Sequence, residues 1–106
     1  YNKINPNEAE FHYLKVIELT PNDPMPYINI SNHYLQNTKY KKCVKILEKA
    51  ISETIEAKEI YNNLGIAYLA RKENAKSIDM FKLALKIDAN YKPALDNLKN
   101  LNNIEH

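Results

Sequence analysis

The sequence is poor in the residues that tight turns and cysteine-based sites require. Among its 106 residues there is one glycine, Gly65, and one cysteine, Cys43. A single glycine with five prolines argues against the many tight turns of a β-sandwich or barrel. It also excludes a glycine-rich phosphate-binding loop. A single cysteine excludes an internal disulfide framework and a cysteine-based metal cluster.

Strong charge of one sign and long apolar runs are also missing. The net charge of +2 and the pI near 8.6 fall short of the clustered basicity expected of a nucleic-acid-binding domain. No apolar run approaches the ~18 residues that a membrane-spanning helix needs. The chain begins at Tyr1 with neither an initiator methionine nor a signal-peptide pattern. We therefore expect an excerpt of a longer protein, with no contact to nucleic acid or membrane and with a cytoplasmic location favoured.

Residues that carry catalysis or bind metals do not cluster along the sequence. His12, His33 and His106 share no metal-ligand spacing. Asp79 and Asp88 fit ordinary positions on a helix surface and at a helix end. The sequence therefore predicts no enzymatic activity, no metal site and no cofactor.

The chain does contain a repeat with a period of 34 residues. Segments 27–35 and 61–69 share an initial Tyr, an Asn two residues later, an apolar residue next, then a small residue, and a final Tyr-Leu pair. A fixed period of this length is typical of stacked helical hairpins. Later pairs with the same spacing are Ala50 and Ala84, Leu47 and Phe81, and Ile51 and Leu85.

This pattern resembles the tetratricopeptide repeat (TPR) family, whose aromatic, Leu-Gly, Tyr, small, Ala and Pro positions are spread over one such period. The resemblance covers essentially the whole chain. It implies an all-α fold, an α-α superhelix of TPR hairpins with about six helices. The expected parts are the trailing half of an upstream repeat (1–23), a first TPR (24–57), a second TPR (58–91) and a C-terminal capping helix (92–106).

Start and stop signals predict where each helix lies. Asn5 as a cap with Pro6 in the first turn predicts a helix that ends before Thr20. The remaining helices are predicted over 25–36, 40–54, 58–71, 75–87 and 92–102. In the last of these, Leu95, Leu98 and Leu101 are expected to form the apolar stripe.

Small residues are expected where the two helices of a hairpin come closest, at the usual ~8–10 Å between axes. These contacts pair Ser31 with Cys43 and Gly65 with Ser77. In the last helix Lys99 occupies the matching position, where a lysine cannot pack. That helix is therefore predicted to cap the array.

The N-terminal helix carries an apolar face without a predicted partner. Ala9, Tyr13 and Val16 form the surface that would meet a preceding helix. Two readings follow: the chain is truncated there, or the face mediates self-association as a homodimer.

The TPR resemblance implies a concave groove, lined by the first helix of each repeat, that binds a partner peptide. Asn29, Asn63 and Asn97 recur at 34-residue steps. A carboxamide carries both donors and an acceptor, so such a ladder can pair with an extended peptide backbone. The alternative is that these side chains serve bonds within the array, since 15 of 106 residues are Asn. The predicted peptide-binding residues are Ile28, Asn29, Asn32, Asn62, Asn63, Ile66 and Asn97.

The family's carboxylate clamp for chaperone tails is disfavoured here. Its two asparagine positions match Asn32 and Asn63, but its basic positions fall on uncharged residues. Without cations, a buried dicarboxylate cannot be compensated. The three positions that lack a basic residue are Ile28, Pro93 and Asn97.

A second charged feature is the lysine face formed by Lys41, Lys45 and Lys49. A solvated helix surface is its ordinary interpretation. The alternative is a docking stripe for an acidic partner or an anionic lipid.

The predicted function is thus a scaffold for protein–protein interaction through the groove. One alternative is a structural module that dimerises or docks within a larger parent protein. Another is an RNA-binding helical repeat, which the lack of basic residues in the groove disfavours.

Overall fold

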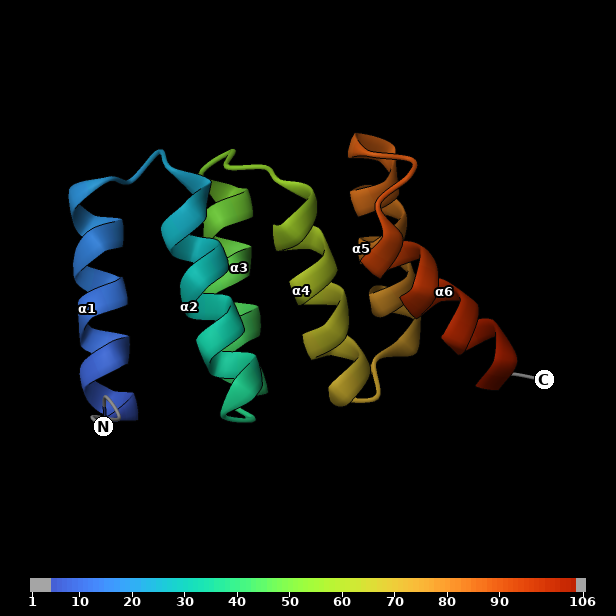
Figure 1. Cartoon of the computed structure of the whole chain (residues 1–106), viewed down its shortest axis with the longest axis horizontal. Helices are drawn as coiled ribbons and strands as arrows, with labels where there is room; N and C mark the ends of the chain where they lie inside the picture. The colour runs from blue at the N-terminus through green and yellow to red at the C-terminus, as the bar shows by residue number, and fades with distance from the viewer. Residues whose placement is uncertain (1–4, 105–106) are drawn as a thin grey trace.

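The computed structural model describes residues 5–104; residues 1–4 and 105–106, including His106, lie outside that range. Within it the chain forms six helices and no strand, so the predicted all-α fold is confirmed. Figure 1 shows the helices in a row that follows chain order, with α1 and α6 at its opposite ends and α2 partly in front of α3. The helices are α1 (Pro6–Leu19), α2 (Pro24–Gln36), α3 (Tyr40–Ser52), α4 (Lys58–Ala70), α5 (Asn74–Ile87) and α6 (Lys92–Ile104).

Two helices start with an acidic or amide cap followed by proline. Asn5 accepts a hydrogen bond from the Asn7 amide at 2.9 Å, and Pro6 opens α1, as the sequence predicted. Asp23 caps α2 in the same way, accepting from the Met25 amide at 3.0 Å. Such caps satisfy amide groups that have no partner inside the helix.

The turns after α2, α3 and α4 each place a non-glycine residue in the left-handed region. Their φ angles are 56° at Thr38, 61° at Thr54 and 64° at Lys72. This conformation costs an ordinary residue about 1–2 kcal/mol. The single glycine is not used for a turn, because Gly65 lies inside α4.

The predicted contacts between small residues hold both hairpins together. The Ser77 hydroxyl donates to the Gly65 carbonyl at 2.8 Å, and the Cys43 thiol donates to the Ser31 carbonyl at 3.8 Å. All four residues are buried. The two hairpins are thus joined at equivalent positions, one period apart.

The hairpins differ in how they fill the space beside that contact. A Cβ atom on Gly65 would lie 2.6 Å from Cε1 of the Phe81 ring. The ring is fully buried and occupies the space that a side chain at residue 65 would need. At the equivalent places the first hairpin has Ser31 and Leu47. The second hairpin therefore has no side chain where the first has Ser31, and it has a larger aromatic ring where the first has Leu47.

Four buried tyrosines donate their hydroxyl groups to glutamates. Because a buried phenol needs a hydrogen-bond partner, these pairs satisfy groups that packing would otherwise leave unpaired. The bonds run from Tyr27 to Glu53 at 2.9 Å, and from Tyr34 to Glu10, Tyr61 to Glu56 and Tyr68 to Glu48 at 2.6 Å each.

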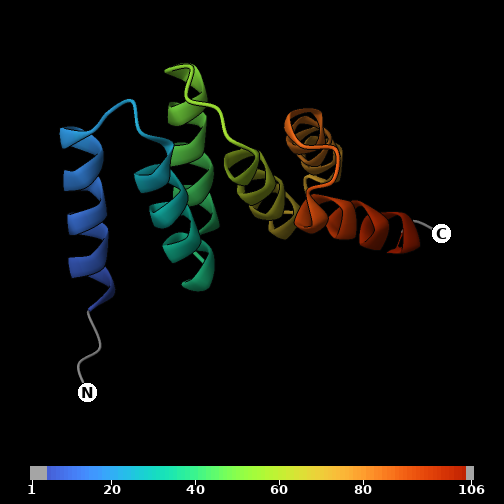
Figure 2. The ribbon, with the colours of Figure 1, turned by 45° about the horizontal axis from the view of Figure 1, so that its top comes forward.

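Helix α6 covers the end of the second hairpin and leans away from the row (Figure 2). It packs on α5 through buried Ala94 and Leu101, with Leu98 partly buried between them. The prediction that Leu95 belongs to this stripe is wrong, because its side chain is 44% exposed. Spacings of four and three put Ala94, not Leu95, in line with Leu98 and Leu101. Lys99 is exposed, as expected.

No helix among residues 5–104 is long and apolar enough to cross a membrane.

Candidate partner-binding surfaces

The seven residues predicted to bind a peptide lie on α2, α4 and α6, but in different environments. Asn29 and Asn32 are exposed, and Ile66 and Asn97 are partly buried. The other three are largely covered by neighbouring helices, with exposed fractions of 7% for Ile28, 4% for Asn62 and 7% for Asn63. That a partner contacts these residues stays a prediction.

Asn63 on α4 forms a hydrogen-bonded link to α2. Its amide nitrogen donates to the Ser31 hydroxyl oxygen at 2.8 Å and to Oδ1 of Asn32 at 2.9 Å. The Ser31 hydroxyl donates its own hydrogen to the Ile28 carbonyl at 2.8 Å. Because that hydrogen is already used, the Ser31 oxygen acts as the acceptor, and the amino group of Asn63 must face it. This network fixes the orientation of the Asn63 carboxamide.

The fixed orientation turns the other end of the carboxamide away from the link. In the described part of the chain, the one fully buried side-chain polar atom without a hydrogen-bond partner is Oε2 of Glu73, which lies 3.6 Å from Nε of Arg71. Oδ1 of Asn63 accepts none of the hydrogen bonds found among the described residues, so it is the end of the carboxamide that the link leaves without a partner. Asn63 itself is 7% exposed, whereas Asn29, its equivalent one period earlier, is exposed on α2.

The third asparagine of the ladder bonds differently. Asn97 on α6 donates from Nδ2 to Oδ1 of Asn62 at 3.1 Å. The residue equivalent to Asn32 in the second repeat is Ile66, which offers no acceptor. Asn97 therefore bonds to Asn62, which lies one helical turn before Ile66 on α4. Two of the three ladder asparagines thus make bonds within the array, the alternative already apparent from the sequence.

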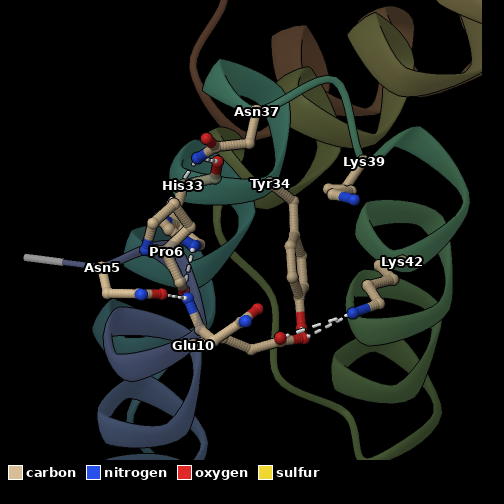
Figure 3. Close-up of a pocket in the computed structure, with 9 residues that line it drawn as sticks. Asn5, Pro6, Glu10, His33, Tyr34, Asn37, Lys39 and Lys42 are labelled. Atoms are coloured by element: carbon tan, nitrogen blue, oxygen red, sulfur yellow. Dashed lines mark hydrogen bonds and ion pairs between the residues drawn. The ribbon is translucent and has the colours of Figure 1, made fainter.

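Three hollows surround α1, away from the asparagine ladder. The first, of about 270 Å³, is shown in Figure 3. In it the Tyr34 hydroxyl and the Lys42 ammonium converge on the Glu10 carboxylate, at 2.6 Å and 3.1 Å. The bond from Tyr34, aided by Lys42, lowers the pKa of Glu10, while burial and this carboxylate raise the pKa of Tyr34. The lining residues are Asn5, Pro6, Asn7, Glu10, His33, Tyr34, Asn37, Lys39 and Lys42.

The second hollow lies between α1 and α3 and has a volume of about 410 Å³. We refer to it as the α1–α3 hollow. It combines apolar side chains with three lysines that follow one face of α3. Its lining residues are Glu10, Leu14, Tyr34, Lys42, Lys45, Ile46 and Lys49.

The third hollow, of about 740 Å³, lies between α1 and α2 and includes Ala9 and Tyr13 from the predicted N-terminal apolar face. The Tyr13 ring packs against the His33 ring, with centroids 5.7 Å apart. Val16, the third residue of that face, is 44% exposed.

Sequence reasoning did not identify the hollows around α1, although it did single out Lys45 and Lys49 as part of a lysine face. Glu10 and Leu14 are far from these lysines in sequence and lie near them only because α1 and α3 are neighbours in the fold. No local signal marks that proximity.

Cys43 offers no reactive site. Its thiol is fully buried, and burial raises its pKa to about 12, so the nucleophilic thiolate is scarce at neutral pH. Among the described residues no group of three or more His, Cys, Asp or Glu side chains is arranged to hold a metal ion.

A family model for the tetratricopeptide repeat matches residues 26–53 and 58–91, more than half of the chain. The first range covers nearly all of α2 and α3, and the second covers α4 and α5. No curated protein matches the chain.

Proposed function

Because the chain belongs to the tetratricopeptide repeat family, which is in general a non-catalytic scaffold for protein–protein interaction, we propose that it binds an extended segment of a partner protein. The binding surface is the face of α2, α4 and α6 that carries the asparagine ladder. The observation that carries this proposal is the orientation of the Asn63 carboxamide, whose amino group is held by Ser31 and Asn32.

In the proposed complex Asn63 accepts a hydrogen bond through Oδ1 from a backbone amide of the partner. Asn29, exposed on α2, supplies both a donor and an acceptor to the neighbouring peptide unit. Asn32 keeps donor hydrogens, because its bond with Asn63 uses only its oxygen. Paired bonds of this kind hold a backbone without reading its side chains.

Apolar contact adds to these hydrogen bonds. Ile66 is partly exposed on α4 and offers a surface to a partner side chain. Ile28, Asn62 and Asn97 shape the floor, because Ile28 and Asn62 are buried and Asn97 is bonded to Asn62. The exposed residues thus make the contact, and the buried ones hold them in place.

The test is a titration of peptides selected from a random library on the wild-type protein. We expect Asn29→Ala to weaken their binding about tenfold, since one pair of hydrogen bonds to the backbone is lost. Asn29 makes no hydrogen bond within the described array, so this change leaves the fold intact. Asn22→Ala, an exposed asparagine in the turn before α2, is the matched control. Equal affinities of wild type and Asn29→Ala would overturn the proposal.

A second candidate function is self-association through the N-terminal face. The observation in its favour is that Val16 is 44% exposed beside the hollow lined by Ala9 and Tyr13. A dimer would bury this apolar surface. Light scattering at rising concentration should then show a dimer that Val16→Glu dissociates. Phe11→Glu, on another flank of α1, should leave that dimer intact.

A further inference from the structure

We propose that the α1–α3 hollow is a second docking site, which takes an acidic segment of a partner protein anchored by one large apolar side chain. It uses none of the residues of the asparagine ladder. It goes beyond the proposed groove function and stands on separate observations.

The floor of the hollow is apolar and open. Leu14 on α1 is 42% exposed, and Ile46 on α3 is partly buried beside it. Phe11, three residues before Leu14 on the same helix, is 63% exposed and extends the apolar surface along α1. The volume of about 410 Å³ falls in the range of about 300–1,000 Å³ typical of ligand pockets. A leucine or phenylalanine side chain can therefore enter it.

The rim is positively charged. Lys42, Lys45 and Lys49 are spaced by three and four residues, which places them on one face of α3. Glu10 is the single carboxylate among the lining residues, and it is already engaged by Lys42 at 3.1 Å. The net charge of the lining therefore favours carboxylates on the ligand.

The three lysines differ in their ion-pair partners. Lys49 lies 3.8 Å from Glu53, with both side chains about half exposed, a pairing that contributes little. Lys45 has no carboxylate within ion-pair distance among the described residues 5–104. An acidic segment therefore gains the most binding free energy by placing a carboxylate beside Lys45.

The shape of the site favours a protein segment over a membrane. A helix that binds a lipid surface presents its apolar side chains outward, so that they enter the flat boundary of the bilayer. Here Leu14 and Ile46 lie in a hollow between two helices, with lysines along the α3 side. A protruding side chain of a partner reaches such a floor, whereas a flat bilayer does not.

The experiment uses a fluorescent peptide of glutamates around one central phenylalanine, titrated with the protein and followed by anisotropy. We expect saturable binding that Lys45→Glu weakens about tenfold, since it sets like charges against each other. Lys82→Glu makes the same charge change at an exposed position of α5, away from the hollow, and should bind like wild type. Replacing the central phenylalanine with alanine, or Leu14 with Gln, should also weaken binding.

Several outcomes would overturn the proposal. Equal losses from Lys82→Glu and Lys45→Glu would indicate diffuse charge attraction and no site. A failure of the peptide to saturate would remove the site altogether. If phosphatidylserine vesicles bind the protein and displace the peptide, the surface is a lipid contact. Asn29→Ala should leave this binding unchanged, which separates its outcome from that of the groove.

Discussion

Asn63 and Ser31 share a hydrogen bond of 2.8 Å that joins the second TPR to the first. Both side chains are buried, and the same amino group of Asn63 also reaches Asn32. A residue that the sequence marks as a peptide clamp is therefore also a link between repeats. In the proposed complex these roles are compatible, since the link uses the amino group and leaves the oxygen for the partner.

The link predicts that Asn63→Ala destabilises the protein even without any partner. The change removes the amino group that donates to Ser31 and Asn32, and the buried Ser31 oxygen loses its donor. We expect the free energy of unfolding in urea to fall by about 1–3 kcal/mol. Asn29→Ala, which removes an exposed amide of the same ladder, should stay within about 0.5 kcal/mol of wild type. Equal stabilities of the two variants would show that the link between Asn63 and α2 does not stabilise the fold.

Features that depend on residues close in sequence could be predicted. The Asn5 cap, the start of α1 at Pro6 and the contact of Ser31 with Cys43 all follow from local signals or from the 34-residue period. A period places equivalent residues in equivalent surroundings as long as the hairpins stack alike. For that reason the fold of this chain could be predicted from its sequence.

Features that depend on the partner of a side chain could not be predicted. The period makes Asn63 and Asn97 equivalent, yet the first bonds to Asn32 and the second to Asn62. The difference arises because Ile66 replaces the acceptor and the last helix leans away from the row. The α1–α3 hollow likewise depends on where the fold places α1 and α3, which line it from two sides and are separated in the sequence by α2.

The turn after α4 predicts a stabilising substitution. Lys72 holds a φ of 64°, which is strained for a side chain with a Cβ but ordinary for glycine. Relief of about 1–2 kcal/mol is partly offset by the greater freedom of glycine in the unfolded chain. We expect Lys72→Gly to raise the free energy of unfolding by about 0.5–1 kcal/mol. Thermal unfolding measures both this gain and its control, Arg71→Gly, which has a φ of −90° and should lower the free energy of unfolding.

The fit of Phe81 over Gly65 predicts an energetic coupling between them. Gly65→Ala gains up to about 1 kcal/mol of helix propensity but loses about 1–3 kcal/mol through overpacking, because the buried ring is 2.6 Å away. The net effect should be destabilising.

The first hairpin suggests the compensating change. Gly65→Ser with Phe81→Leu recreates the pair formed by Ser31 and Leu47. In a double-mutant cycle the two changes together should lower the free energy of unfolding by less than the sum of the single changes. We expect a difference of about 0.5–3 kcal/mol. Additive effects would mean that the ring does not restrict residue 65.

The buried tyrosines predict a loss of stability at alkaline pH. Burial and the neighbouring glutamates raise the pKa of Tyr27 and of Tyr61 to about 12, from an ordinary value of 10.0. The same causes raise the pKa of Tyr34 and of Tyr68. Each folded pKa lies above its unfolded value, so the unfolded chain loses its protons first. This stabilisation is complete below pH 10 and disappears as the pH rises toward 12.

Tyr68→Phe tests the origin of that loss. At neutral pH it removes the hydroxyl bond to Glu48, and we expect a decrease of about 1 kcal/mol in the free energy of unfolding. The phenylalanine has no proton to lose, so the stability of the variant should fall less steeply above pH 10. The two curves, measured by circular dichroism in urea, should therefore converge as the pH rises. Parallel curves would show that ionisation of Tyr68 is not linked to unfolding, because linkage requires its pKa to differ between the two states.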